Sequence, residues 1–241
     1  MHIAVLNANV DRSRFAQGWP DDAQKVIAGL QPHRPGWRYS AWQACDGELP
    51  PTDDDADGWV ITGSIASVND EAPWMLALEE RIRQRHAQRQ PTAGLCFGHQ
   101  LVAKALGGRV GNSPDGWRLG VATTSLQPPL PAWMPPQQGA FRLHAVHEEQ
   151  VLEAPAGVQV LGGDSHTPVA AMAAGQHLFT TQYHPELSGP FMQALLDAFG
   201  SAWPAALVAR ARQELAGPMD AEAFMGWLAA FLDNPLPPEP R

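Results

Sequence analysis

Hydrophobic and polar positions follow two alternating periods in the first half of the chain. Short, fully apolar runs of the kind found in buried parallel strands end at polar or glycine residues. Each is followed by a segment with apolar residues three and four apart, which is helical spacing. The predicted strands are 2–7, 37–42, 58–64 and 92–95, and the predicted helices are 22–30, 73–88 and 98–106. This alternation predicts an α/β fold with a mostly parallel central sheet flanked by helices.

The pattern changes after residue 118. Short β-rich runs near 119–126, 139–146, 157–162 and 168–172 are separated by glycine and proline, and a strand over 177–183 and a helix over 191–199 follow. These runs predict a small β-rich portion added to the sheet. The tail predicts two amphipathic helices over 203–232, interrupted at Gly217-Pro218, and a frayed Pro-rich end. We therefore expect one α/β domain over 1–198 and a C-terminal helical extension over 199–241.

Charge and hydropathy exclude two classes of partner. The formal net charge is -9, which argues against nucleic acid binding. We interpret Arg81, Arg83, Arg85 and Arg89 as one solvated helix face, because Glu79 and Glu80 precede them. No apolar run approaches membrane-spanning length, and the N-terminus runs directly into a strand pattern without a secretory signal. The expected location is the cytoplasm.

Cys96 stands where a predicted strand turns into a predicted helix, with Gly94 and Gly98 on either side. A reactive side chain flanked by glycines at a strand-to-helix turn has the geometry of a nucleophile elbow. The first amides of the following helix would face the sulfur and favour a thiolate. The competing interpretation is a buried core cysteine, which is a common fate of a free thiol.

His184 and Glu186 offer a base and a group to orient it, as a cysteine nucleophile requires. They lie two residues apart after a predicted strand, so their side chains would point the same way. Taken singly, they could be a packed histidine and a solvated carboxylate. In a parallel sheet the carboxyl ends of the strands share one edge, which would bring them to Cys96. The amides of Gly63 or Ser64, and of Phe97, are then candidates for an oxyanion hole.

The motifs Gly94–Gln100 and Gln182–Glu186 together resemble the class I (triad) glutamine amidotransferases, specifically the stand-alone GMP-synthase-like members. The resemblance spans about residues 1–198 and implies a flavodoxin-like fold without a cofactor. It implies that Cys96 attacks a γ-glutamyl amide to form a thioester, with His184 as base and Glu186 orienting it. Gln100 matches a position that helps to hold glutamine. Many members have Gly-Gly-Pro where this chain has Gly63-Ser64-Ile65, an exchange that keeps a backbone donor but alters the surface beside the substrate.

Three functions remain open from the sequence. The first is a glutaminase that hands ammonia to a synthetase on a separate chain, because the sequence contains no Gly-x-x-x-x-Gly-Lys loop. The second is a self-sufficient hydrolase of γ-glutamyl amines or peptides. The third is a catalytically silent binding protein on the same fold.

Two further features suggest no additional chemistry. His144 and His147 resemble a metal-binding pair, but on a strand they would face opposite sides, and a third ligand at a familiar spacing is lacking. We therefore expect no metal site and place this segment at the rim of the substrate site. The nine tryptophans are interpreted as ordinary core and surface aromatics.

Overall fold

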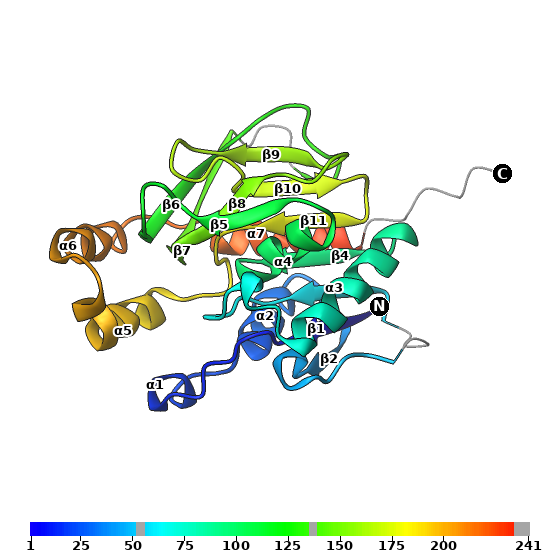
Figure 1. Cartoon of the computed structure of the whole chain (residues 1–241), viewed down its shortest axis with the longest axis horizontal. Helices are drawn as coiled ribbons and strands as arrows, with labels where there is room; N and C mark the ends of the chain where they lie inside the picture. Colours follow the sequence, from blue (N-terminus) through cyan, green and yellow to red (C-terminus); the bar gives the residue numbers. More distant parts are fainter. Residues whose placement is uncertain (52–55, 135–138, 234–241) are drawn as a thin grey trace.

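A nine-stranded sheet forms the centre of the protein, which is described here by a computed structural model over residues 1–51, 56–134 and 139–233 (Figure 1). The strand order is β2-β1-β3-β4-β11-β10-β9-β6-β7, and β5 and β8 form a separate two-stranded sheet. The strands are β1 (His2–Leu6), β2 (Arg38–Trp42), β3 (Gly58–Ile61), β4 (Thr92–Leu95), β5 (Arg109–Asn112), β6 (Arg118–Leu126), β7 (Ala140–His147), β8 (Glu149–Glu153), β9 (Gln159–Gly163), β10 (Ala171–Ala174) and β11 (Leu178–Thr181).

Helices cover both faces of this sheet. The α-helices are α1 (Arg14–Gln17), α2 (Asp22–Leu30), α3 (Pro73–Ala87), α4 (Phe97–Ala105), α5 (Gly189–Phe199), α6 (Ala205–Glu214) and α7 (Ala221–Leu232), and short 3₁₀ turns cover Ala44–Asp46, Val68–Asp70 and Gly200–Ala202. In β1, Ile3 and Val5 pack with α2 and α7, whereas Ala4 and Leu6 pack with α3 and α4. Successive residues therefore bury opposite faces of the sheet, as strand geometry requires.

The parallel part of the sheet sets the position of the site. The pairs β2/β1, β1/β3, β3/β4 and β4/β11 are all parallel, so these strands end at the same edge. The strands β10, β9, β6 and β7 add to β11 in antiparallel pairs. The predicted α/β class is confirmed, and the β-rich second half extends the same sheet.

Three local features differ from the sequence-based expectation. The short helix α1 and the pair β5/β8 were not predicted. The interpretation of four arginines as a solvated face is wrong for Arg85, which is only 6% exposed. Its Nε donates to Thr92 Oγ1 at 3.1 Å, its Nη2 donates to the Pro91 carbonyl at 2.9 Å, and its guanidinium lies 4.4 Å from the Trp59 ring centroid.

The C-terminal helices pack against the sheet. The predicted break at Gly217-Pro218 is confirmed, since α6 ends at Glu214 and α7 begins at Ala221. The Phe224 ring on α7 lies 5.0 Å from Phe141 on β7 and 5.4 Å from Phe179 on β11. The domain boundary at residue 198 stays a prediction, and the Pro-rich end from residue 234 lies outside the described residues. In the described part of the chain, every helix is too short or too polar to span a bilayer.

Replacing Phe224 by Ala tests how much α7 contributes to the core. Phe224 is fully buried, and truncating a buried phenylalanine leaves a cavity that costs about 3–5 kcal/mol. We expect the free energy of unfolding in urea to fall by that amount. Leu76→Ala, at a side chain 48% exposed on α3, is the control and should change it by less than about 1 kcal/mol. Equal small changes in both variants would show that α7 adds little to the core.

Candidate active site

Cys96 lies between β4 and α4 in a conformation that L-residues rarely adopt. Its backbone has φ 50° and ψ -104°, a strain on the order of 1–3 kcal/mol that the surrounding structure must offset. The Cys96 amide donates to the Thr181 carbonyl on β11 at 2.9 Å, and the Gln100 amide donates to the Cys96 carbonyl at 3.0 Å. The neighbouring parallel strand and the first turn of α4 thus hold the strained residue in place.

Gly94 and Gly98 allow the chain to turn this tightly. A Cβ on Gly94 would lie 2.6 Å from the Gly98 carbonyl, and a Cβ on Gly98 would lie 2.4 Å from the Ile61 carbonyl oxygen. The Gly98 amide also donates to the Thr62 carbonyl at 3.1 Å. The start of α4 therefore packs directly on the backbone at the ends of β3 and β4, with no space for side chains at these two positions.

His184 and Glu186 form a buried pair next to Cys96. The His184 amide donates to the His144 carbonyl at 2.9 Å, which fixes the backbone just after β11. The His184 Nδ1 and the Glu186 Oε1 are 2.7 Å apart, and the two side chains are 8% and 1% exposed. The His184 Nε2 has no hydrogen-bond partner among the described residues and is the ring nitrogen available to the thiol.

The surroundings of His184 favour its charged form. Burial by itself would lower the pKa of His184, but the negative charges of Glu186 and of a Cys96 thiolate outweigh burial and raise this pKa well above its ordinary value. The pair is thus able to take up a proton at Nε2 and to hold it inside the protein.

The turn after β3 brings backbone amides to the same place. A Cβ on Gly63 would lie 3.0 Å from the His184 Cε1 and 3.6 Å from the Cys96 Cβ, so Gly63 lies next to both residues and leaves little space for a side chain. The amides of Gly63, Ser64 and Phe97 have no acceptor within the described part of the chain. Unpaired amides beside a nucleophile are potential donors to a developing oxyanion.

Two glutamines extend the site. The Gln182 Nε2 lies 3.6 Å from the Cys96 Sγ. The Gln100 Nε2 donates to the Gln182 Oε1 at 3.2 Å and to the Glu149 carbonyl at 2.7 Å, so its amino group is already engaged within the protein. Gln182 is not among the predicted site residues. The signal for it was its place two residues before His184, on the same side of an extended chain.

His144 and His147 are buried beside the pair of His184 and Glu186. Burial lowers the pKa of His144 to about 4 and that of His147 to about 3, and the His147 Nδ1 lies 3.1 Å from the Glu149 carbonyl oxygen. Within the described ranges, no group of three or more His, Cys, Asp or Glu side chains could hold a metal ion.

A cavity of about 890 Å³ connects these residues. Six of the seven predicted site residues line it: Gly63, Ser64, Cys96, Gln100, His184 and Glu186. The seventh, Phe97, is buried, with its ring 5.5 Å from the Trp74 ring. The structure therefore brings together a thiol, an imidazole paired with a carboxylate, and free amides. This combination is suited to nucleophilic attack on a carbonyl group.

Comparisons with known proteins point to one family. The family model "Glutamine amidotransferase class-I" matches residues 39–202. "Gamma-glutamyl peptidase 2" of Arabidopsis thaliana is 26% identical over 166 residues, which cover 67% of each chain. "GMP synthase [glutamine-hydrolyzing]" of Aeropyrum pernix is 31% identical over 141 residues, which cover 55% of this chain and 24% of that protein. A crystal structure of a glutamine amidotransferase from Thermotoga maritima shares the fold, with a TM-score of 0.72 over 96% of both chains at 15% identity.

Gly98→Ala tests the packing of the elbow. The added methyl group would press on the Ile61 carbonyl, and such overpacking costs about 1–3 kcal/mol. We expect a lower free energy of unfolding in a urea titration. Gly36→Ala, where a Cβ meets nothing within 4 Å, is the matched control and should unfold like the wild type. Unchanged stability of the Gly98 variant would contradict the described contact.

Glu186→Gln tests the electrostatics of the pair. Without the carboxylate, one of the two charges that raise the pKa of His184 against burial is gone, so this pKa should fall. The measurement is an NMR pH titration of the His184 ring. With the carboxylate present, charged His184 stabilises the fold most below the unfolded pKa of about 6.5, and this contribution is lost as pH rises through the raised folded pKa.

Glu148→Gln is the control for this titration, because Glu148 lines the same cavity but is not among the groups that shift the pKa of His184. A His184 pKa that stays equally high in the Glu186 variant would show that Glu186 is not the cause.

Proposed function

The chain belongs to the class-I glutamine amidotransferase family, and we propose that it is a cysteine hydrolase that cleaves the side-chain amide of glutamine or of a related γ-glutamyl compound. The observation that carries the proposal is the buried His184–Glu186 pair, 2.7 Å apart, beside Cys96 on a strained strand-to-helix turn. Family members are hydrolases of amide bonds, and the thiol, the imidazole and the carboxylate that this chemistry needs line one cavity.

The reaction proceeds through a thioester. The His184 Nε2 takes the proton of the Cys96 thiol, the Sγ attacks the amide carbon, and a C–S bond forms. The C–N bond then breaks, and the leaving nitrogen takes a proton from the His184 Nε2 as ammonia or an amine. His184 next takes a proton from water, whose oxygen attacks the thioester, and the C–S bond breaks to release glutamate and restore the thiolate. Throughout, Glu186 holds the proton at Nδ1 and keeps the imidazole in the useful orientation.

Backbone amides stabilise the tetrahedral intermediates. The amides of Gly63 or Ser64, and of Phe97, are the proposed oxyanion donors, and one such donor is typically worth about 10²–10³ in turnover. Gln100 is proposed to position the glutamyl group, acting with Gln182. The scheme requires only side chains, backbone amides and water.

Two versions of this function differ in what happens to the nitrogen that leaves the substrate. In the first, ammonia passes to a separate synthetase chain; the similarity to a glutamine-hydrolysing GMP synthase over 24% of that protein supports such a pairing. In the second, the protein acts alone on γ-glutamyl compounds. The similarity to a γ-glutamyl peptidase over 67% of both chains supports this version. A cytoplasmic location remains a prediction for either.

Glutamate release from glutamine and from γ-glutamylethylamide tests the proposal. We expect Cys96→Ala to lower turnover by at least about 10³-fold, because the thioester can no longer form. Cys45→Ala is the control, since Cys45 lies outside this cavity, and it should retain wild-type turnover. Equal turnover in wild type and Cys96→Ala would refute the role of Cys96. Inertness of the wild type toward both compounds would favour the silent binding protein.

A further inference from the structure

The cavity that holds the triad continues well beyond it. Its far end is lined by aromatic rings from segments that are distant in sequence: Phe15 on α1, Trp19 after α1, and Phe191 and Phe199 on α5. We call these four side chains the aromatic wall. Trp117 and Trp203 line the same cavity, with their ring centroids 5.5 Å apart.

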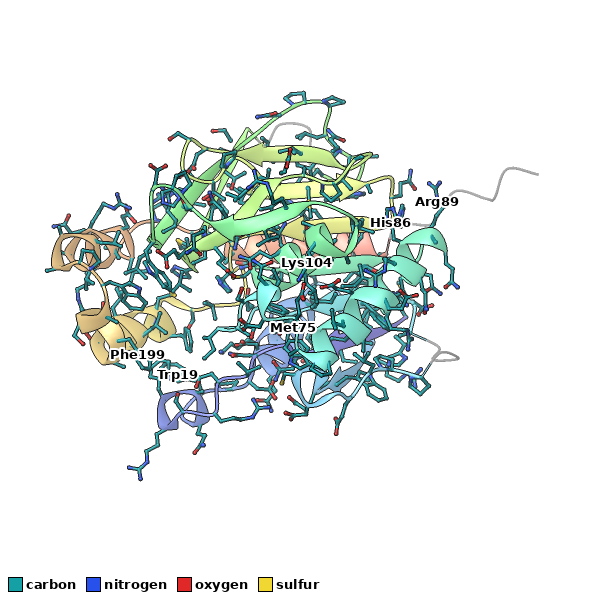
Figure 2. The ribbon with its side chains drawn as sticks, viewed as in Figure 1. Trp19, Met75, His86, Arg89, Lys104 and Phe199 are labelled. Atoms are coloured by element: carbon teal, nitrogen blue, oxygen red, sulfur yellow. The ribbon has the colours of Figure 1, made fainter. Side chains whose placement is uncertain are left out.

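The rings of the aromatic wall contact one another directly. Phe15 lies 5.2 Å from Phe199 and 5.6 Å from Phe191, and Trp19 lies 5.2 Å from Phe191. In Figure 1, α1 and α5 project from the same side of the molecule, and Figure 2 shows Trp19 and Phe199 between them. The helix α1 has four residues and buries none of them, so its place next to α5 depends on these ring contacts.

Exposed apolar side chains gather at this cavity. Among the described residues, the large apolar side chains classed as exposed are Met1, Ile65, Leu76, Trp117 and Phe199, at 37–73% exposure. Three of them, Ile65, Trp117 and Phe199, line the cavity. An apolar side chain that stays in water contributes no stabilisation from burial. A cleft lined by exposed apolar side chains is typical of a binding site for an apolar group.

Charged groups next to the aromatic wall are engaged with protein partners. The Lys25 Nζ lies 2.6 Å from the Asp22 Oδ1 and 4.2 Å from the Phe191 ring centroid. Asp21 caps α2 by accepting from the Gln24 amide at 2.7 Å. At Lys25 and Asp21 these polar atoms are already engaged within the protein, and the rings supply the apolar surface at this end.

Substrate geometry connects this surface to the reaction. A γ-glutamyl amide bound with its carbonyl carbon at Cys96 has a glutamyl part on one side and an amine part on the other. The volume of about 890 Å³ lies near the top of the range of about 300–1,000 Å³ that suits drug-sized ligands, and glutamine, whose leaving group is ammonia, is much smaller.

We propose, on the premise that Cys96 hydrolyses γ-glutamyl amides, that the aromatic wall binds the amine part of the substrate and that this part is a bulky, uncharged apolar group such as an arylalkyl amine. Ring-on-ring contacts and the burial of Phe199 and Trp117 supply the selectivity. Glutamine reaches the same nucleophile but leaves the aromatic wall empty.

Hydrolysis of a matched substrate pair tests this assignment. γ-Glutamylphenethylamide and γ-glutamylethylamide both release a primary alkyl amine and differ by one phenyl ring. We expect kcat/KM to be at least about tenfold higher for the phenethylamide. In Phe199→Ala this ratio should fall several-fold toward one. Leu76→Ala, which removes an exposed apolar side chain of α3 outside the cavity, should leave both values as in the wild type.

The outcomes separate this proposal from the proposed function. Hydrolysis of both amides with equal kcat/KM, together with an unchanged ratio in Phe199→Ala, would overturn the role of the aromatic wall while leaving the hydrolase intact. A ratio that falls equally in Leu76→Ala would also overturn it. No hydrolysis of either amide or of glutamine would overturn the hydrolase itself.

Discussion

The backbone conformation of Cys96 is the constraint on which the site depends. A residue keeps the strained backbone conformation of φ 50° and ψ -104° only when the surrounding structure holds it there. Gly94 and Gly98 remove the side chains that would otherwise collide with the ends of β3 and α4. The Thr181 carbonyl on β11 accepts from the Cys96 amide. The strand β11, whose Thr181 carbonyl holds the Cys96 amide, continues to His184 three residues later. The pairing of β4 with β11 therefore fixes the positions of both Cys96 and His184.

Burial makes the interaction between the charged forms of His184 and Glu186 strong. A charged imidazole with so little exposure needs a partner, because an unpaired charge in a low-dielectric interior is costly. Glu186 supplies that partner at 2.7 Å and leaves Nε2 without a partner among the described residues, as the proposed proton transfers require. A side chain at Gly63 would press on the His184 ring. The cavity is therefore lined by polar groups around Cys96 and by aromatic rings from α1 and α5, a contrast that fits the proposed substrate with two unlike halves.

Much of this arrangement could be predicted from the sequence because it follows from local pattern and parallel-sheet geometry. Cys96 and His184 follow strands that share one edge, so their meeting needed no knowledge of packing. Features that depend on distant partners could not be predicted. Arg85 looks like a surface residue until Trp59 and the Pro91 carbonyl are placed beside it. Phe15 and Phe199 look like ordinary aromatics, because nothing local shows that α1 and α5 converge on the same cavity.

Alkylation by a chloroketone analogue of glutamine tests whether Cys96 is the nucleophile, because such a reagent places an electrophilic carbon close to where the amide carbon of glutamine would bind. After digestion, mass spectrometry identifies the modified cysteine while glutamate release is followed in parallel. We expect alkylation of Cys96 rather than Cys45, loss of hydrolysis in proportion to labelling, and slower labelling when glutamine is present. Alkylation confined to Cys45, or full hydrolytic activity after Cys96 is modified, would contradict the role of Cys96 as the nucleophile.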